Sequence, residues 1–399
     1  MTTKESFATP NACSVCSSRD ISVFIEIPRL PVHCNLLWPS REEALQAPRG
    51  DIRLGFCNDC GHIYNLAFNP ELMEYSQVYE NSLHFSPRFQ EYARSLASRL
   101  VERYDLHDKD IIEIGCGKGD FLMMLCELGG NRGVGFDPSY VPERTASRGN
   151  GQMSVIQDFY SERYAGYQAD LICCRHVLEH VQFPRQFLHT VYSTMENKPE
   201  TKVLFEVPNV MFMLRDLSIW DIIYEHCSYF SRRSLARLFN SCGFEVFNVM
   251  EAFEGQFLCI EALLGKDFAD PGENYLDDPD GVSARVAAFS DRYWHKIGSW
   301  QTNLKRIEGN GQRAVIWGAG SKGVTFLNAL GVQDEISHIV DINPNKHGKY
   351  VPGTGQRVVA PKFLREYQPD IVIVMNRIYS NEIKKMVNSI GIAPEIIPV

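Results

Sequence analysis

The sequence contains no long apolar run and no excess of basic residues. None of its apolar stretches approaches the ~18 residues that a membrane-spanning helix needs, and residues 1–13 are polar where a secretory signal would be apolar. Its 40 Lys and Arg are outnumbered by 49 Asp and Glu, so the average field repels long polyanions. We therefore expect a cytoplasmic protein that has neither a membrane nor a nucleic acid as partner.

A composition typical of disorder or of fibres is also absent. Hydrophobic residues make up 44 % of the 399 positions and charged residues 22 %, which are globular values. A chain of this length predicts two or three domains with sizeable cores. Nothing in the composition indicates an obligate protein partner.

Cysteine, in contrast, is plentiful. Twelve cysteines without a secretory signal favour metal ligands or buried thiols over disulfides. Two C-x2-C motifs lie about 40 residues apart, the arrangement by which zinc ribbons form a tetrahedron of thiolates. Four protein ligands leave no open position for water or substrate, so we predict a structural Zn2+ rather than a catalytic one. The predicted metal ligands are Cys13, Cys16, Cys57 and Cys60.

A glycine-rich turn follows an apolar segment in the middle of the chain. Residues 110–114 predict a strand, the pattern E-x-G-x-G-x-G begins at Glu113, and a helical pattern follows. Glycines let the backbone approach a ligand, and a helix N-terminus favours a carboxylate. A second predicted strand ends in Asp137, about twenty residues on, where a carboxylate can accept both ribose hydroxyls. These features predict a ligand that contains a nucleoside.

Strands and helices continue to alternate beyond this turn. The last two strands, predicted at 244–250 and 257–264, form a hairpin, so we expect a doubly wound sheet with an antiparallel edge. Within this region His176, Glu179 and His180 match the inverted zincin pattern H-x-x-E-H. Because they follow a strand of a nucleotide-binding sheet and no third ligand is evident, we favour a wall of the donor pocket instead.

Candidate catalytic residues follow the fifth predicted strand, at the edge of the sheet where acceptors approach. They lie in the stretch that begins Tyr224-Glu225-His226, and Tyr79 lies in a segment that could fold over the pocket. Removing a proton from carbon next to a ketone needs a base of near-neutral pKa and donors for the enolate oxygen. Methyl transfer to oxygen or nitrogen places fewer demands on the site, because no enolate forms.

The C-terminal region carries a second glycine turn. An acidic segment, 267–281, predicts a linker, and residues 283–308 predict a long helix. A strand, G-x-G-x-x-G and a helix follow from residue 314, and a second strand ends in a carboxylate. Fewer than ninety residues with about four strands predict a half-fold that holds one nucleotide. The lysines that could meet a phosphate there are Lys322, Lys346 and Lys349.

The first glycine turn, Asp137 and the stretch His176-Val177-Leu178-Glu179-His180 together resemble the class I methyltransferases that use S-adenosylmethionine, over roughly residues 105–265. The resemblance implies that the glycines line the methionine end, that Asp137 holds the ribose and that two further residues flank the adenine. The residues implied for this cofactor site are Glu113, Gly115, Gly117, Gly119, Asp137, Asp158, Phe159 and His176.

Along nearly the full chain, the order of these motifs is similar to that of the nucleotide-sugar C-methyltransferases. That family methylates carbon 3 of a 4-keto deoxysugar attached to thymidine diphosphate. The resemblance implies His226 as the base, assisted by Glu225, Tyr79 and Tyr224, and a terminal domain that helps to hold the sugar nucleotide. Two departures concern the glycine turn, where Gly117-Lys118 replaces the common Asn-Asp, and Tyr224-Glu225-His226, which is one residue shorter than the family's Tyr-His-Glu-His.

We therefore expect an α/β protein in four parts. These are a zinc-ribbon-like domain at 1–70, a class I methyltransferase domain with an antiparallel edge at 71–266, a linker and long helix at 267–312, and a small Rossmann-like domain at 313–399. The expected function is S-adenosylmethionine-dependent C-methylation next to a ketone of a nucleotide-linked deoxysugar. The alternatives are an O- or N-methyltransferase of a non-sugar specialised metabolite and a non-catalytic nucleotide-binding protein.

Overall fold

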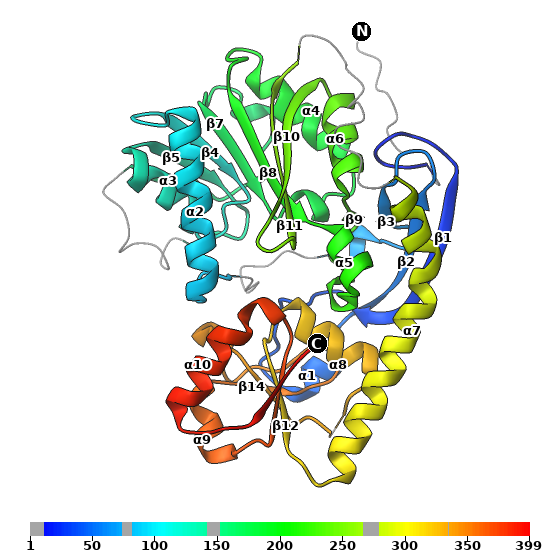
Figure 1. Ribbon diagram of the computed structural model, residues 1–399. Coiled ribbons are helices and arrows are strands. Elements are labelled where there is room, and N and C mark those ends of the chain that lie inside the picture. The colour runs from blue at the N-terminus through cyan, green and yellow to red at the C-terminus, as the bar shows by residue number, and fades with distance from the viewer. Residues whose placement is uncertain (1–11, 74–81, 142–151, 266–278, 334) are drawn as a thin grey trace.

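Three sheets organise the chain, and a computed structural model describes them over residues 12–73, 82–141, 152–265, 279–333 and 335–399. Figure 1 shows a larger α/β body built on the central sheet and a smaller one built on the C-terminal sheet. The N-terminal strands and the long helix α7 lie along one side of both bodies. Within the described ranges, no helix is both long and apolar enough to cross a membrane.

The first sheet is antiparallel, with the order β1-β2-β3-β9. Its fourth strand comes from the central part of the sequence, directly after His226, and pairs Tyr229 with Ile63. The N-terminal domain is therefore tied to the segment that carries the predicted base. Its elements are β1 (Ile21–Pro31), α1 (Arg41–Leu45), β2 (Arg49–Cys57), β3 (Ile63–Asn65) and β9 (Ser228–Tyr229).

The central sheet has seven strands in the order β10-β11-β8-β7-β4-β5-β6. The five from β8 to β6 are parallel, whereas β11 runs antiparallel to both of its neighbours, as the sequence predicts. Its strands are β4 (Asp110–Ile114), β5 (Arg132–Phe136), β6 (Met153–Ile156), β7 (Leu171–Arg175), β8 (Lys202–Pro208), β10 (Phe244–Ala252) and β11 (Phe257–Leu264). Its helices are α2 (Pro87–Tyr104), α3 (Asp120–Gly129), α4 (Pro184–Met195), α5 (Val210–Asp216) and α6 (Arg232–Ser241).

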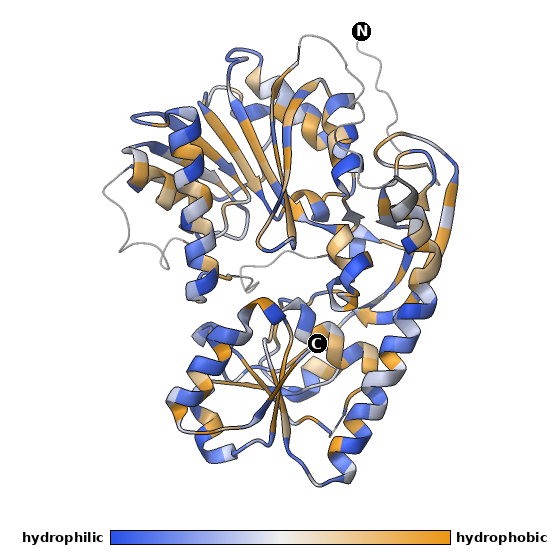
Figure 2. Cartoon of the chain, in the orientation of Figure 1, coloured by the Kyte–Doolittle hydropathy of each residue, from blue (hydrophilic) through white to orange (hydrophobic). Residues whose placement is uncertain are grey.

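Burial explains why these strands are apolar throughout. Every residue of β7 is buried, and so are the five interior residues of β8, because helices cover both faces of a parallel sheet. Figure 2 shows the strands of the central and C-terminal sheets largely as hydrophobic, while hydrophilic residues are frequent on helices such as α2. α2 starts where Ser86 caps Phe89 N and Pro87 takes the first turn.

The C-terminal sheet is fully parallel, with the order β14-β13-β12-β15-β16. The sequence predicted about four strands here, and the structure corrects this to five, because the three residues of β14 are too few for a periodic pattern. The elements are β12 (Ala314–Trp317), α8 (Ser321–Leu330), β13 (His338–Val340), β14 (Arg357–Val359), α9 (Leu364–Tyr367), β15 (Ile371–Val374), α10 (Ser380–Ile390) and β16 (Glu395–Pro398).

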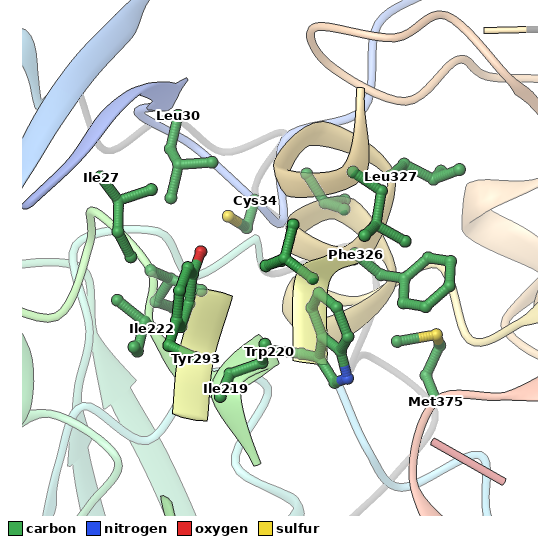
Figure 3. Close-up of a cluster of buried hydrophobic side chains, with 14 of the residues drawn as sticks. Ile27, Leu30, Cys34, Ile219, Trp220, Ile222, Tyr293, Phe326, Leu327 and Met375 are labelled. Carbon is green, nitrogen blue, oxygen red and sulfur yellow. The ribbon is translucent and has the colours of Figure 1, made fainter. Parts of the chain in front are cut away.

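One hydrophobic core joins all three parts. Helix α7 (Pro279–Gly309) contacts β1, α5 and α8, and the predicted acidic linker before it lies largely outside the described residues. In Figure 3 side chains from all three parts meet, among them Leu30 of β1, Trp220 after α5 and Phe326 of α8. Trp220 and Phe326 are fully buried, with ring centroids 4.8 Å apart. The domains therefore share a core that fixes their relative positions.

Candidate active site

A cavity of about 800 Å³ lies between the central and C-terminal domains. It is lined by the first glycine turn (Gly115 to Lys118) at one end and by the second (Gly318 to Gly323) at the other, and His226 borders it as well. Parallel sheets place such turns at the carboxyl ends of their strands, where ligands of open α/β sheets bind. The two nucleotide-binding motifs of the sequence therefore face one space.

The first glycine turn has the backbone that only glycine adopts without cost. Gly115, Gly117 and Gly119 all have positive φ, at +69°, +56° and +78°. A Cβ on Gly115 would lie 2.2 Å from Val177 Cγ2, whereas a Cβ on Gly117 would meet nothing within 4 Å. The open space above Gly117 is a cradle that fits the backbone approach of a ligand.

Asp137 is fixed at the end of β5 beside this turn. Its Oδ2 accepts a hydrogen bond from Gly117 N at 2.8 Å, and its Oδ1 accepts from Ser139 N and Oγ at 2.8 and 2.6 Å. Each carboxylate oxygen can accept a further hydrogen bond. The predicted ribose carboxylate thus lies in the cavity wall, positioned by the turn itself.

The predicted adenine residues lie at the exposed rim of the cavity. Phe159 is 64 % exposed, which leaves its ring available to stack on a base. Asp158 accepts hydrogen bonds from Phe159 N and Tyr164 Oη and pairs with Arg163. Asp158 is therefore already hydrogen-bonded within the protein, whereas the exposed ring of Phe159 can contact a base.

Glu113 lies beneath the glycine turn rather than at its surface. Its side chain is buried and accepts a hydrogen bond from Leu122 N at 3.1 Å, in the first turn of α3. Burial raises the pKa of its carboxyl to about 8, against the lowering effect of Arg175. Glu113 thus connects β4 to the helix whose N-terminus faces the cavity.

A buried cluster of charged residues lies in the cavity wall near the first glycine turn. His176 Nε2 lies 2.7 Å from Glu206 Oε1, and Arg175 Nη2 lies 2.9 Å from the same oxygen. Tyr92 Oη donates to the other oxygen of Glu206. Burial alone would lower the pKa of His176, but Glu179 and Glu206 outweigh it and raise that pKa to about 9. His176 therefore presents a cationic wall to the cavity at neutral pH.

His226 is the centre of a second cluster in the cavity wall. Its ring lies 4.9 Å from that of His180 and 6.0 Å from that of Tyr229, and ligand-type atoms of Glu179, His180 and His226 lie within 4.8 Å of one another. His180 Nδ1 donates to the carbonyl of Glu225 at 2.9 Å. Such a trio could also hold a metal ion, but the metal would occupy the lone pairs that acid–base chemistry needs.

Burial keeps His226 uncharged. Its pKa is lowered well below the ordinary histidine value by burial, and the positive charges of His180, His176 and Lys322 lower it further. The imidazole is therefore neutral, and able to take a proton, at neutral pH.

Two of the predicted assistants point away from the cavity. The Tyr224 hydroxyl accepts from Asn69 N at 2.8 Å, and its ring closes over Gly50. Glu225 is fully buried and accepts from Cys34 N at 3.2 Å. Neither side chain lines the cavity. The sequence predicted both residues as assistants of the base, but the structure turns them towards the N-terminal domain, because successive residues project in different directions.

Three further features concern Tyr79, Tyr229 and the H-x-x-E-H stretch. Tyr79 lies outside the described residues. Tyr229, three residues after His226, was not singled out from the sequence, yet it lines the cavity beside His226. The H-x-x-E-H stretch forms no α-helix, since only Leu178–His180 make one 3-10 turn and His176 has a left-handed backbone. That geometry does not fit the inverted zincin alternative.

The C-terminal wall contributes charged side chains. Lys346 is buried, and its Nζ donates to Ala319 O at 3.0 Å while it lies 3.5 Å from Asp341. Lys322 pairs across the domain boundary with Asp221. The cavity is lined by Lys346, Asp341, Lys322 and Asp221, but not by Lys349. Gly323 leaves no room for a side chain, since a Cβ there would lie 2.1 Å from Gly318 O.

The four cysteines of the two C-x2-C motifs converge as predicted. Cys13 Sγ lies 3.5 Å from Cys60 Sγ, and Cys16 Sγ lies 3.5 Å from Cys57 Sγ. All four sulfurs are within 4.8 Å of one another. Thiolates around a tetrahedral Zn2+ are separated by about 3.8 Å. This donor set fits a closed four-thiolate metal site.

Two family models match the chain, and they match different domains. A methyltransferase domain matches residues 88–249, and a C-methyltransferase C-terminal domain matches residues 283–393. The central fold and its glycine turn define a class I S-adenosylmethionine-dependent methyltransferase. The match of the terminal domain and the similarity to a C-methyltransferase support a relationship to the C-methyltransferases.

Individual relatives are distant. C-methyltransferase NovU of Streptomyces niveus is 26 % identical over 315 residues, 73 % of this chain and 72 % of its own. A ubiquinone biosynthesis O-methyltransferase of Salmonella paratyphi A is 27 % identical over 26 % of this chain and 44 % of its own. The solved structure of the mitomycin 7-O-methyltransferase MmcR shares 17 % identity over 43 % of this chain and 54 % of its own, with a TM-score of 0.36.

Proposed function

We propose that this enzyme methylates the carbon next to a ketone of a nucleotide-linked deoxysugar, with His226 as the base. The observation that carries the proposal is the position of His226, in a cavity that extends between two nucleotide-type glycine turns. The similarity to a C-methyltransferase over most of the chain supports transfer to carbon. The second glycine turn supports an acceptor that carries a nucleotide of its own.

The chemistry follows from the state of His226. Its neutral imidazole takes the proton from the carbon next to the ketone, and the C–H electron pair passes into the enolate. S-adenosylmethionine supplies an electrophilic methyl group when bound. The donor would be held by the turn from Gly115 to Gly119, by Asp137 at its ribose and by Phe159 at its adenine.

We further propose that the four cysteines hold a structural Zn2+. Their sulfurs close the coordination shell, so the ion would stabilise the N-terminal domain and would not meet the substrate. Through β9 this domain holds the segment that follows His226.

The acceptor class can be tested with matched substrates. The enzyme is incubated with S-adenosylmethionine and a panel of thymidine-diphosphate 4-keto deoxysugars, and each is paired with its 4-hydroxy analogue, which has no acidic C–H. We expect mass spectrometry to find methylation of a keto sugar only, and NMR to place the methyl group on carbon. Methylation of the 4-hydroxy sugar, or a methyl group on oxygen or nitrogen, would contradict the proposal. Absence of S-adenosylmethionine binding by calorimetry would favour a non-catalytic nucleotide-binding protein.

A further inference from the structure

Lys322 crosses from the C-terminal domain into the space beside His226. It is the second residue of α8, in the second glycine turn, yet its Nζ reaches the central domain. There it donates to Ser218 Oγ at 3.4 Å and pairs with Asp221. The side chain is only 15 % exposed, so this contact is a built feature of the domain boundary.

The contact lies at the acceptor end of the cavity. Asp221 precedes His226 by five residues, and the hydrogen bond from His226 N to Ile223 O at 3.2 Å folds the intervening chain into a turn. Lys322, Asp221 and His226 all line the same cavity. Consistent with this proximity, the charge of Lys322 contributes to the lowered pKa of His226.

The ammonium group retains donor capacity in this arrangement. It has three N–H groups, and in the described part of the chain only Asp221 and Ser218 accept hydrogen bonds from it, while the centroid of the Phe212 ring lies 5.9 Å from Nζ. A partly buried cation with a remaining N–H, aimed from the opposite domain, is suited to a negative charge that develops in the cavity.

We propose that Lys322 stabilises the enolate oxygen of the acceptor, so that the C-terminal domain completes the catalytic site. The inference rests on the proposed function and deepens it. When His226 takes the proton, the C–H electron pair forms the carbon–carbon double bond of the enolate, and the carbonyl electron pair moves onto oxygen. An N–H of Lys322 then donates to this oxygen. The charge on Lys322 is unchanged, and the proton removed stays on His226.

Solvent deuterium exchange without the methyl donor isolates this step. In heavy water with a saturating thymidine-diphosphate 4-keto sugar, the enzyme is expected to exchange the hydrogen next to the ketone. We expect Lys322→Met to slow this exchange about 100-fold, the usual effect of removing one such donor. The control Lys385→Met removes an exposed lysine of the same domain, outside the cavity, and should exchange at the wild-type rate.

Binding measurements separate this role from phosphate binding, which the sequence alone also allowed for Lys322. We expect the affinities of Lys322→Met for thymidine diphosphate and for S-adenosylmethionine, measured by calorimetry, to stay within twofold of wild type. Unchanged exchange would overturn the assignment. So would a loss of thymidine-diphosphate affinity that accounts for the slower exchange, because Lys322 would then be a phosphate ligand.

A double variant tests whether the ion pair is merely structural. Lys322→Met leaves Asp221 without its cation, although Ser218 Oγ still donates to it, and Lys322→Met/Asp221→Asn removes that negative charge as well. We expect the double variant to remain slow, whereas recovery of wild-type exchange would overturn the assignment. If the wild-type enzyme exchanges no deuterium with any keto sugar, the proposed function fails and this assignment with it. Wild-type exchange with an unaffected Lys322→Met overturns the assignment alone.

Discussion

Three neighbouring residues have three different environments in the Tyr224-Glu225-His226 stretch. His226 borders the cavity, Tyr224 bonds to Asn69, and Glu225 bonds to the backbone of Cys34. The sequence predicted this segment as catalytic because ionisable side chains cluster there after a strand of a nucleotide-binding sheet, and one of the three residues, His226, lines the cavity. It could not assign directions, since these depend on how the N-terminal domain packs against the turn.

Tyr224→Phe should therefore affect stability and not catalysis. The substitution removes the hydrogen bond that Asn69 N donates to the Tyr224 hydroxyl. Because Asn69 is exposed and water can replace the acceptor, we expect a loss of about 0.5–1.5 kcal/mol. We expect a lower urea midpoint with an unchanged methyl-transfer kcat. Tyr192→Phe is the matched control, because no hydrogen bond of its hydroxyl occurs among the described residues. A large fall in kcat for Tyr224→Phe would restore Tyr224 to the catalytic residues.

The pH dependence of kcat/KM reports the pKa of the proposed base in the free enzyme. The active form of His226 is neutral, and burial with nearby positive charge holds its pKa well below the ordinary value of about 6.5. As pH falls, activity should therefore persist through pH 6.5 and decline only at lower pH. A bell-shaped or sigmoid profile with its acidic midpoint above 6.5 would contradict this account.

At the scale of elements, different glycines of the first glycine turn should matter for ligand binding and for stability. Gly117→Ala places a methyl group in the open space of the cavity, at a backbone cost of about 1–2 kcal/mol for its positive φ. Gly115→Ala has the same backbone cost and a collision with Val177 in addition. We expect calorimetry to show S-adenosylmethionine affinity reduced about tenfold in Gly117→Ala. We expect Gly115→Ala to be the less stable of the two in urea. Equal stability, or unchanged affinity in Gly117→Ala, would argue against this geometry.

Long periodic elements were predictable, and short ones were not. The strand at 257–264 was predicted with the bounds that β11 has, and the helix predicted at 283–308 lies within α7. The three-residue β14 and the two-residue β9 were missed. Strands this short carry no periodic pattern, and pairing with neighbours distant in sequence stabilises them.

At the scale of the whole molecule, the predicted zinc site is connected to the predicted base. β9 pairs with β3 of the N-terminal sheet, and Tyr229 of β9 lies beside His226. The sequence predicted the four cysteines from their spacing. It gave no indication that a strand from the methyltransferase domain completes their sheet.

Loss of the metal should therefore slow catalysis indirectly, through the N-terminal sheet that holds the segment after His226. Elemental analysis should find one zinc per chain. Cys60→Ser should lose this zinc, unfold at a lower temperature and transfer methyl groups more slowly, while S-adenosylmethionine binding persists because the donor site lies on the central sheet. Cys242→Ser changes a buried thiol outside the cluster and should keep its zinc. Wild-type protein without zinc, or a zinc-free Cys60→Ser with full activity, would contradict the prediction.

Proton removal by His226 before methyl transfer is the central claim, and deuterium exchange tests it most directly. Wild-type enzyme and His226→Asn are each incubated in heavy water with a thymidine-diphosphate 4-keto deoxysugar and no methyl donor. The account predicts deuterium next to the ketone with wild type and at least about 100-fold slower uptake with His226→Asn. Calorimetry should show that the variant still binds S-adenosylmethionine. Exchange by His226→Asn at the wild-type rate would show that another group removes the proton and would contradict the account.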